Sequence, residues 1–199
     1  MPRLLIATGN AGKAREFRAL LAGGPFEVVE AAVLGWTVPE IPETGETFAA
    51  NAERKAVETS RLLPPGQRDA LLVLGDDSGL CVDALGGAPG IFSARYAADG
   101  RHVERLLEEM RGIPEQKRAA RFVCCLALAR AGALLRAVTG TVEGRIAERP
   151  SGTGGFGYDP VFYFPPLGRT FAELAAPEKG AVSHRARAVA ALLAAIRAG

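Results

Sequence analysis

The sequence lacks any apolar run of membrane-spanning length and has little excess charge of either sign. A membrane helix needs about 20 consecutive apolar residues, whereas the longest apolar stretches, such as 122–129, have the length of a strand. With 24 basic and 22 acidic residues the net charge is +2, so neither a nucleic acid nor a membrane surface is an expected partner. Only Leu4 to Ala7 are apolar before a turn at Gly9, so we expect no targeting segment.

Cysteine is also scarce, with three residues in the whole chain. Cys124 and Cys125 are neighbours whose side chains would point to opposite faces of a strand, so they are poor disulfide partners. No Cys-x-x-Cys or cysteine–histidine spacing predicts a zinc site. We therefore expect reduced thiols and a cytoplasmic protein. Because the chain has no repeat, low-complexity segment or linker, it predicts a single domain over 1–199.

The hydrophobic pattern predicts an α/β fold, because strands and helices alternate through the first half of the chain. The expected strands are 4–8, 26–33, 71–74, 121–129 and 134–142. The expected helices are 11–22, 47–63 capped by Thr44 or Thr47, one capped by Asp99, and one capped by Ser183. The last two strands flank a short turn and predict a hairpin, so the sheet should be mixed. We expect one compact unit with a cleft between two lobes.

The first segment with potential chemistry is Thr8-Gly9-Asn10-Ala11-Gly12-Lys13, which joins a strand to a helix. Backbone N–H groups at a helix N-terminus attract anions, and Lys13 adds a mobile positive charge. The segment lacks the Gly-x4-Gly-Lys-Ser/Thr pattern of a P-loop. It is therefore either a phosphate site or an ordinary turn with a solvated lysine.

The second segment is Gly75-Asp76-Asp77-Ser78-Gly79, which we expect to form a turn after a buried strand. Adjacent carboxylates repel one another, so the pair favours a nearby cation. If the chain is extended there, the two side chains point opposite ways and serve different purposes. One could face Mg²⁺ or a water, since hard cations take oxygen ligands. An aspartate-rich turn without function is the alternative.

The third segment, 151–160, carries four glycines in six positions, which lets the backbone approach a ligand closely. Phe156 could stack on a flat heterocycle, an interaction worth ~1–3 kcal/mol between bases and aromatic rings, or it could enter the core with Tyr158. A fourth segment, Ser183-His184-Arg185, opens the last helix, and Lys179 lies upstream. Cations at a helix N-terminus oppose its dipole, which is easier to explain if they donate to a ligand. Together the four segments indicate a nucleotide.

Six ordered motifs support a resemblance to a known family. They are Thr8-Gly9-Asn10 with Lys13, Glu43-Thr44-Gly45 with Thr47-Phe48 and Asn51-Ala52, 76–80, Gly86-Gly87-Ala88-Pro89-Gly90 with Ser93-Ala94-Arg95-Tyr96, 152–160, and 183–185. These motifs resemble the inosine/xanthosine triphosphate pyrophosphatases, called Ham1-like or RdgB-like. The resemblance implies an ITPase-like fold, a long mixed twisted sheet flanked by helices with two lobes around a central cleft. It also implies a homodimer that uses Mg²⁺ to hydrolyse dITP, ITP and XTP to the monophosphate and pyrophosphate, which cleanses the nucleotide pool.

The resemblance further implies roles for individual residues. Asp77 matches the proton acceptor and a metal ligand. Pro42 stands where some relatives carry a carboxylate that binds the metal. The second metal carboxylate is therefore either Glu40 or Glu43, and Glu43 is preferred. The implied substrate contacts are Thr8, Gly9, Asn10, Ala11, Gly12, Lys13, Ser78, Phe156, Gly157, Tyr158, Asp159, Lys179, His184 and Arg185.

Base recognition can be argued from the donors at the start of the last helix. Arg185 carries only donors and His184 can donate, which suits the 6-oxo group of hypoxanthine or xanthine. A 6-amino group would leave unmet donors that cost ~1–3 kcal/mol each. This argument accounts for rejection of ATP and leaves the rejection of GTP unexplained.

Two other functions compete with this interpretation. One is a Maf-like pyrophosphatase acting on modified pyrimidines. The other is a non-catalytic domain that senses nucleotides or binds nucleic acid. The absence of a basic stripe with interleaved aromatic residues weighs against nucleic acid, and the paired aspartates beside Ser78 weigh against a passive sensor.

Overall fold

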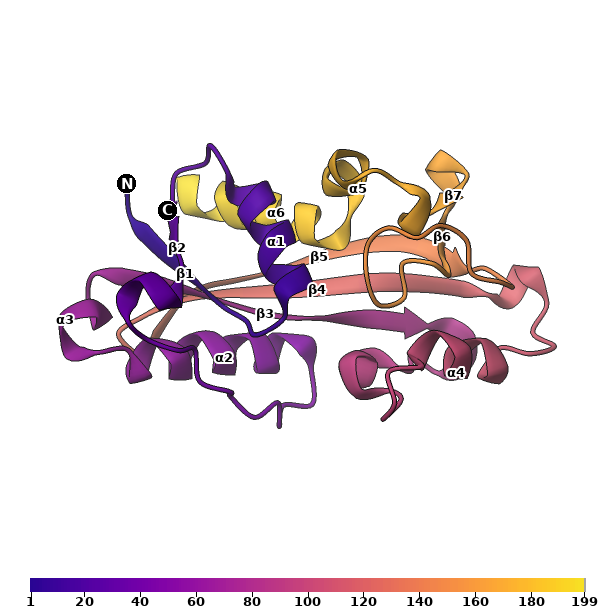
Figure 1. Ribbon diagram of the computed structural model, residues 1–199, viewed down its shortest axis with the longest axis horizontal. Coiled ribbons are helices and arrows are strands. Elements are labelled where there is room, and N and C mark those ends of the chain that lie inside the picture. The colour runs from indigo at the N-terminus through magenta and orange to yellow at the C-terminus, as the bar shows by residue number, and fades with distance from the viewer. Residues whose placement is uncertain (199) are drawn as a thin grey trace. The chain divides into compact units, whose positions relative to one another are not determined.

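The computed structural model describes residues 1–198, whose strands form one seven-stranded sheet in the order β2-β1-β3-β4-β5-β6-β7 (Figure 1). The strands are β1 Arg3–Ala7, β2 Glu27–Val29, β3 Leu71–Val82, β4 Ala119–Arg130, β5 Ala133–Ile146, β6 Phe162–Phe164 and β7 Arg169–Thr170. Strand β1 pairs in parallel with β2 and β3, whereas β6 pairs antiparallel with β5 and β7. The sheet is therefore mixed and flanked by helices, which confirms the predicted fold class.

The helices within the described residues are α1 Ala11–Leu21, α2 Phe48–Leu62, α3 Pro65–Arg68, α4 His102–Glu109, α5 Ala176–Val182 and α6 His184–Arg197. Two caps form as side-chain hydrogen bonds typical of helix N-termini. Asn10 Oδ1 accepts from the Lys13 N–H at 3.0 Å, and Thr47 Oγ1 accepts from the Ala50 N–H at 3.1 Å. No helix in residues 1–198 combines the length and apolarity that crossing a membrane requires.

The chain divides into two compact units. The first comprises Met1–Asp77, Cys124–Gly140 and the segment that begins at Arg185, and the second comprises Ser78–Val123 and Thr141–His184. Strands β3, β4 and β5 contribute residues to both units. The single domain and the cleft expected from the sequence stay predictions.

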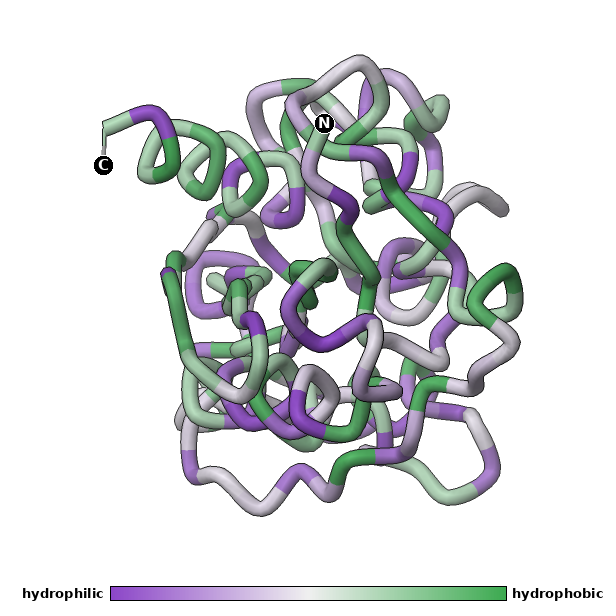
Figure 2. The backbone as a smooth tube through the Cα atoms, turned by 90° about the vertical axis from the view of Figure 1, so that its left-hand side faces the viewer, coloured by the Kyte–Doolittle hydropathy of each residue, from purple (hydrophilic) through white to green (hydrophobic). Residues whose placement is uncertain are grey.

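In the first unit, helices cover both faces of the sheet. Successive residues of a strand point to opposite faces, and accordingly Leu4 belongs to one buried cluster and Leu5 to another. The cluster around Leu4 includes Phe17 of α1 and Val189 of α6, and α6 is drawn mainly in the green of hydrophobic residues in Figure 2. Helix α2 runs along the other face (Figure 1). The first unit therefore holds β3 between α1 and α2.

The second unit has one apolar core. Leu106 of α4 and Met110, the residue that follows α4, are fully buried in it. Phe122 and Phe162 meet there with ring centroids 4.5 Å apart, and Phe162 lies 4.9 Å from Phe171. Tilted aromatic pairs at such separations add favourable edge-to-face contacts to their burial.

Several predicted boundaries are wrong. Strand β3 does not end before Gly75 but continues to Val82; β1 pairs with it only as far as Gly75, and β4 is its neighbour on the other side. Strand β2 stops at Val29, where a short 3₁₀ turn over Ala31–Leu34 follows. Asp99 does not cap α4; its carboxylate accepts from the N–H of Arg101, the residue before that helix. Helix α5 and strands β6 and β7 were absent from the sequence prediction.

Candidate functional site

The acidic pair lies inside strand β3, not in a turn. Because neighbouring strand residues point to opposite faces, the two carboxylates meet different partners. Asp76 Oδ2 lies 2.6 Å from the Nζ of Lys13 on α1, and Asp77 Oδ2 accepts from the Nδ2 of Asn51 on α2 at 2.9 Å. Both carboxylates are almost fully buried. The predicted division of roles between them therefore has a structural basis.

Asp76 is an ionised carboxylate held by cations. Burial alone would raise its pKa, but the charges of Lys13, Arg185 and Lys55 and the Lys13 contact outweigh burial and lower the pKa. The Cys124 thiol donates to Asp76 Oδ1 at 3.3 Å. Burial and the charge of Asp76 raise the pKa of that thiol well above its usual value, so Cys124 keeps its proton.

The pKa of Asp77 is shifted in the opposite direction to that of Asp76. Burial raises its pKa, and the opposing effects of Lys55 and the Asn51 hydrogen bond do not cancel that increase. Lys55 Nζ lies 3.9 Å from Asp77 Oδ1, donates to the Asp76 carbonyl at 3.1 Å and forms an ion pair with Glu43. Asp77 and Glu43 thus converge on one ammonium. A carboxylate whose pKa is raised is suited to accept a proton near neutral pH.

Residues 9–11 of the predicted phosphate loop are exposed at the N-terminus of α1. Gly9 has no atom within 4 Å of where a Cβ would lie, and the neighbouring Asn10 and Ala11 are exposed. The Asn10 N–H donates to Thr8 Oγ1 at 3.2 Å, which folds the turn back before α1 begins. The first-turn N–H groups of α1 and the Lys13 ammonium therefore belong to one turn, where an anion would meet both.

The carboxylates of Asp77 and Glu43 are the groups at this site that could bind Mg²⁺. Mg²⁺ is commonly held by one or two carboxylates together with substrate phosphates and waters. Within residues 1–198 no group of three or more histidine, cysteine, aspartate or glutamate side chains is arranged to hold a metal. Asp77 and Glu43 supply two carboxylates that already face one cation, whereas Glu40 is exposed. This set fits a magnesium ion whose remaining ligands come from the substrate.

The first two residues of α6 fall in different units. In the first unit, Arg185 Nη1 donates to Glu16 Oε2 at 2.9 Å, and Arg185 is almost fully buried. Burial alone would lower the pKa of the Arg185 guanidinium, but the negative charges of Asp76 and Glu16 outweigh burial and raise it. In the second unit, the buried His184 ring stacks on Phe122 with ring centroids 4.6 Å apart. Arg185 thus lies with the Lys13–Asp76 pair, and its predicted contact with the base stays a prediction.

The glycine-rich loop is organised by Asp159 in the second unit. Asp159 Oδ2 accepts from the Phe156 N–H at 2.8 Å and from Lys179 Nζ at 2.5 Å. Lys179 Nζ also lies 4.9 Å from the centre of the Phe156 ring. Gly155 has a φ of +69°, and a Cβ there would collide with the Asp159 carboxylate, so glycine is required. Phe156, Asp159 and Lys179 therefore form one predicted group that the structure brings together.

The remaining predicted contacts of the second unit are Tyr158, Gly157 and Ser78. The Tyr158 hydroxyl donates to the Ser93 carbonyl at 3.0 Å and its side chain is buried, so the ring enters the core, which was the alternative interpretation. Only the backbone of Tyr158 remains for a ligand. Gly157 is exposed with a φ of +61°, and Ser78 is half-buried on β3.

Sequence reasoning gave no role to three side chains of the first unit, Asn51, Lys55 and Glu16, although Asn51 stood in one of the quoted motifs. A signal for two of them existed. Asn51 and Lys55 are four residues apart on the predicted helix 47–63, so they share one face. Glu16 is three residues after Lys13 on α1, but nothing in the sequence indicated its partner, Arg185.

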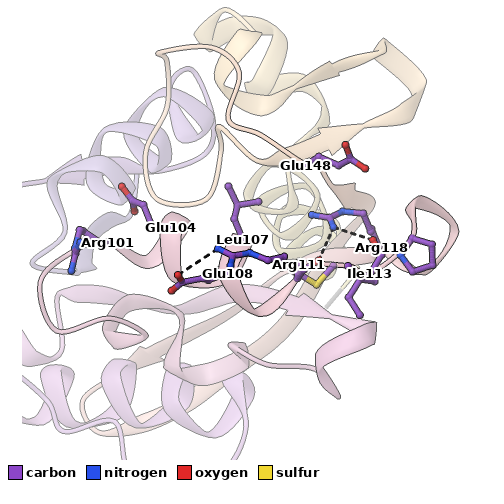
Figure 3. Close-up of a pocket in the computed structure, with 11 residues that line it drawn as sticks. Arg101, Glu104, Leu107, Glu108, Arg111, Ile113, Arg118 and Glu148 are labelled. Carbon is purple, nitrogen blue, oxygen red and sulfur yellow. Dashed lines mark hydrogen bonds and ion pairs between the residues drawn. The ribbon is translucent and has the colours of Figure 1, made fainter.

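A pocket of about 760 Å³ lies elsewhere, in the second unit beside α4 (Figure 3). None of the predicted site residues lines it. Arg118 closes it, with its guanidinium donating to the carbonyls of Met110, Ile113, Ile146 and Ala147. These bonds tie the end of α4 to the end of β5. The pocket is a structural feature outside the predicted site.

Comparisons with known proteins give a consistent result. A family model described as the Ham1 family matches residues 4–195. A dITP/XTP pyrophosphatase from Geobacillus kaustophilus is 50% identical over 197 residues, covering 96% of this chain and 93% of that protein. A dITP/XTP pyrophosphatase from Bacillus licheniformis is 45% identical over 193 residues and 95% of each chain. The structure of a HAM1 protein from Coxiella burnetii matches with a TM-score of 0.84 and 37% identity over 100% of both chains.

Proposed function

This chain belongs to the Ham1 family, and from that premise we propose that it is a Mg²⁺-dependent pyrophosphatase that hydrolyses dITP, ITP and XTP. The products would be the nucleoside monophosphate and pyrophosphate. The relatives named dITP/XTP pyrophosphatase support this proposal, since each is aligned over nearly its full length. The observation that carries it is the acidic pair of β3, with Asp76 bound to Lys13 and Asp77 held beside Glu43 and Lys55.

The reaction needs a water directed at the α-phosphorus and neutralisation of the leaving pyrophosphate. Asp77 accepts the proton of that water, a role that its raised pKa suits. The N–H groups of the α1 turn and the Lys13 ammonium bind the phosphates that leave. When bound, Mg²⁺ supplies charge neutralisation and lowers the pKa of the water. Asp77 and Glu43 would hold it.

In this proposal the nucleoside is recognised by Phe156, Lys179, His184 and Arg185. Phe156 stacks on the base, and Lys179 carries positive charge to the substrate, as the resemblance implies. Lys179 is held by Asp159, which also fixes the loop through the Phe156 N–H. His184 and Arg185 donate to the 6-oxo group. We also propose that the protein is cytoplasmic and that it is a homodimer. Size-exclusion chromatography with light scattering would test the homodimer.

The decisive experiment measures which bond of ITP is cleaved. With Mg²⁺, ITP should yield IMP and pyrophosphate, with no orthophosphate, whereas ATP should be turned over far more slowly. EDTA should abolish the reaction. Release of orthophosphate, or a preference for modified pyrimidine triphosphates such as a Maf-like enzyme would show, would contradict the proposal.

The role of Asp77 has its own test. Asp77→Asn keeps the size of the side chain but removes the proton acceptor and one metal ligand. Turnover should fall by at least the ~10²–10⁴-fold that general-base catalysis contributes. Near-normal turnover of this variant at saturating Mg²⁺ would exclude Asp77 as the proton acceptor.

A further inference from the structure

Asn51 joins two segments that carry proposed site residues. It lies in the first turns of α2 and has no exposed surface. Its Oδ1 accepts from the Gly45 N–H at 2.8 Å, and its Nδ2 donates to Asp77 Oδ2 at 2.9 Å. The Gly45 N–H is a donor, whereas the ionised Asp77 carboxylate offers only acceptors. A side-chain amide carries both an acceptor and a donor, so it satisfies both partners.

The close approach of the loop to Asn51 depends on Gly45. A Cβ at position 45 would lie 2.8 Å from Asn51 Oδ1 and 2.9 Å from the Cβ of Ala50. Contacts under 3.0 Å are not tolerated without movement, so any larger residue would push the loop away. Glu43 is two residues before Gly45, and the loop bond to Asn51 therefore restricts where Glu43 can lie.

Asn51 also determines which oxygen of Asp77 remains available. Oδ2 is committed to the Asn51 amide, whereas Oδ1 faces Lys55 Nζ at 3.9 Å. Lys55 attracts both Glu43 and Asp77, but an ammonium on a flexible stem does not impose a direction on either. The short, buried Asn51 side chain does impose one.

We propose that Asn51 is a positioning residue that fixes the Asp77 carboxylate against the Glu43 loop, so that Asp77 Oδ1 and Glu43 converge. That this convergence of the two carboxylates serves catalysis rests on the proposed function. The bond geometry itself is independent of any substrate. Asn51 neither touches the substrate nor takes part in proton transfer.

The first test is Asn51→Asp. The variant keeps an oxygen for the Gly45 N–H but places a second oxygen against Asp77 Oδ2, where the two repel. We expect kcat for ITP to fall about 10²-fold, the effect of a ~1 Å misplacement, with KM changed less than about threefold since the phosphate loop is untouched. Gly45→Ala should reproduce this split. Gly66→Ala is the matched control, because Gly66 is exposed and has open space around its Cβ position.

A stability cycle gives a readout that needs neither metal nor nucleotide. In EDTA, Asn51→Asp should lower Tm. Adding Asp77→Asn should restore most of that loss, since the new amide at position 77 can donate to the new carboxylate at position 51. The double variant stays inactive. A double variant no more stable than Asn51→Asp would overturn the proposed bond, and wild-type kcat in Asn51→Asp or in Gly45→Ala would overturn the positioning role.

The two proposals can fail separately. If the wild-type chain released no pyrophosphate from ITP, the proposed function would fail, while the stability cycle would still report on the Asn51–Asp77 bond. If the wild type is active and Gly45→Ala behaves like Gly66→Ala, the inference about Asn51 is wrong and the proposed function stands.

Discussion

Replacing Lys13 with methionine removes the cation that faces a buried carboxylate. Lys13 Nζ lies 2.6 Å from Asp76 Oδ2, and the two side chains are 14% and 1% exposed. Methionine keeps most of the aliphatic stem and loses the charge. Asp76 cannot move to water without disturbing the strand, because it lies within β3 and is almost fully buried. The variant therefore isolates the electrostatic contribution of the pair.

The size of the effect follows from this burial. Removing one partner of a buried ion pair costs ~3–5 kcal/mol. The lower end applies here, because Arg185 and Lys55 still lower the pKa of Asp76 after the change. In a chain of this size each kcal/mol corresponds to ~2–4 °C in Tm. Lys13→Met should therefore lower Tm by about 6–12 °C.

The pH dependence has a definite sign. The pKa of Asp76 is lower in the folded protein than the ordinary aspartate value of 3.8. Its ionisation therefore contributes stability that is complete above that value and is lost as pH falls through the folded pKa. The gap in Tm between wild type and Lys13→Met should be full at pH 7 and should shrink below pH ~4.

The assay is thermal unfolding in EDTA without nucleotide, followed by circular dichroism. A second variant, Lys13→Met with Asp76→Asn, replaces the broken pair with a neutral one and should recover more than half of the lost Tm. A single variant within 1 °C of wild type, or a double variant as unstable as the single one, would refute the electrostatic account of this pair.

Three further outcomes follow from the same contacts. Gly75→Ala would place a Cβ 2.6 Å from the Ala56 N atom, so differential scanning fluorimetry should report a loss of stability, of the ~1–3 kcal/mol typical of overpacking. The Mg²⁺ concentration that gives half-maximal turnover of ITP should rise as pH falls into the acidic range, because Asp77 must be ionised to bind the metal and its pKa is raised in the metal-free protein; a Mg²⁺ requirement that does not change with pH would contradict the assignment of Asp77. Lys179→Met removes the partner of Asp159 and should raise KM for ITP at least tenfold in steady-state kinetics, with a smaller change in kcat, since it weakens substrate binding.

The meeting of Lys13 with Asp76 was within reach of sequence reasoning. Both residues follow short apolar runs of the sequence, 4–7 and 71–74, and the carboxyl ends of parallel neighbours meet at one edge. The observed register pairs Ala7, the last residue of β1, with Gly75, the residue before Asp76. The caps at Asn10 and Thr47 were also local enough to predict, because each needs only a side chain and a backbone N–H three residues on.

Other features depend on contacts that no local pattern reports. Gly75-Asp76-Asp77-Ser78 has the composition of a turn, yet it is extended as part of β3. Arg185 finds Glu16 across most of the chain's length, so its environment follows from how α6 packs on α1. The bond between Asn51 and Asp77 likewise requires the docking of α2 on β3.

The extended conformation of β3 explains why two adjacent aspartates can differ in acidity. On the α1 side, Asp76 meets Lys13 and Arg185, whose charges outweigh burial and lower its pKa. On the α2 side, Asp77 meets one amide and one more distant ammonium shared with Glu43, and burial prevails. A site that needs a permanent counter-ion and a proton acceptor requires two carboxylates whose pKa values are pushed apart. Adjacent positions in a turn would share one solvent environment, whereas adjacent positions in a strand do not, and this is the physical reason to assign proton transfer to Asp77 and not to Asp76.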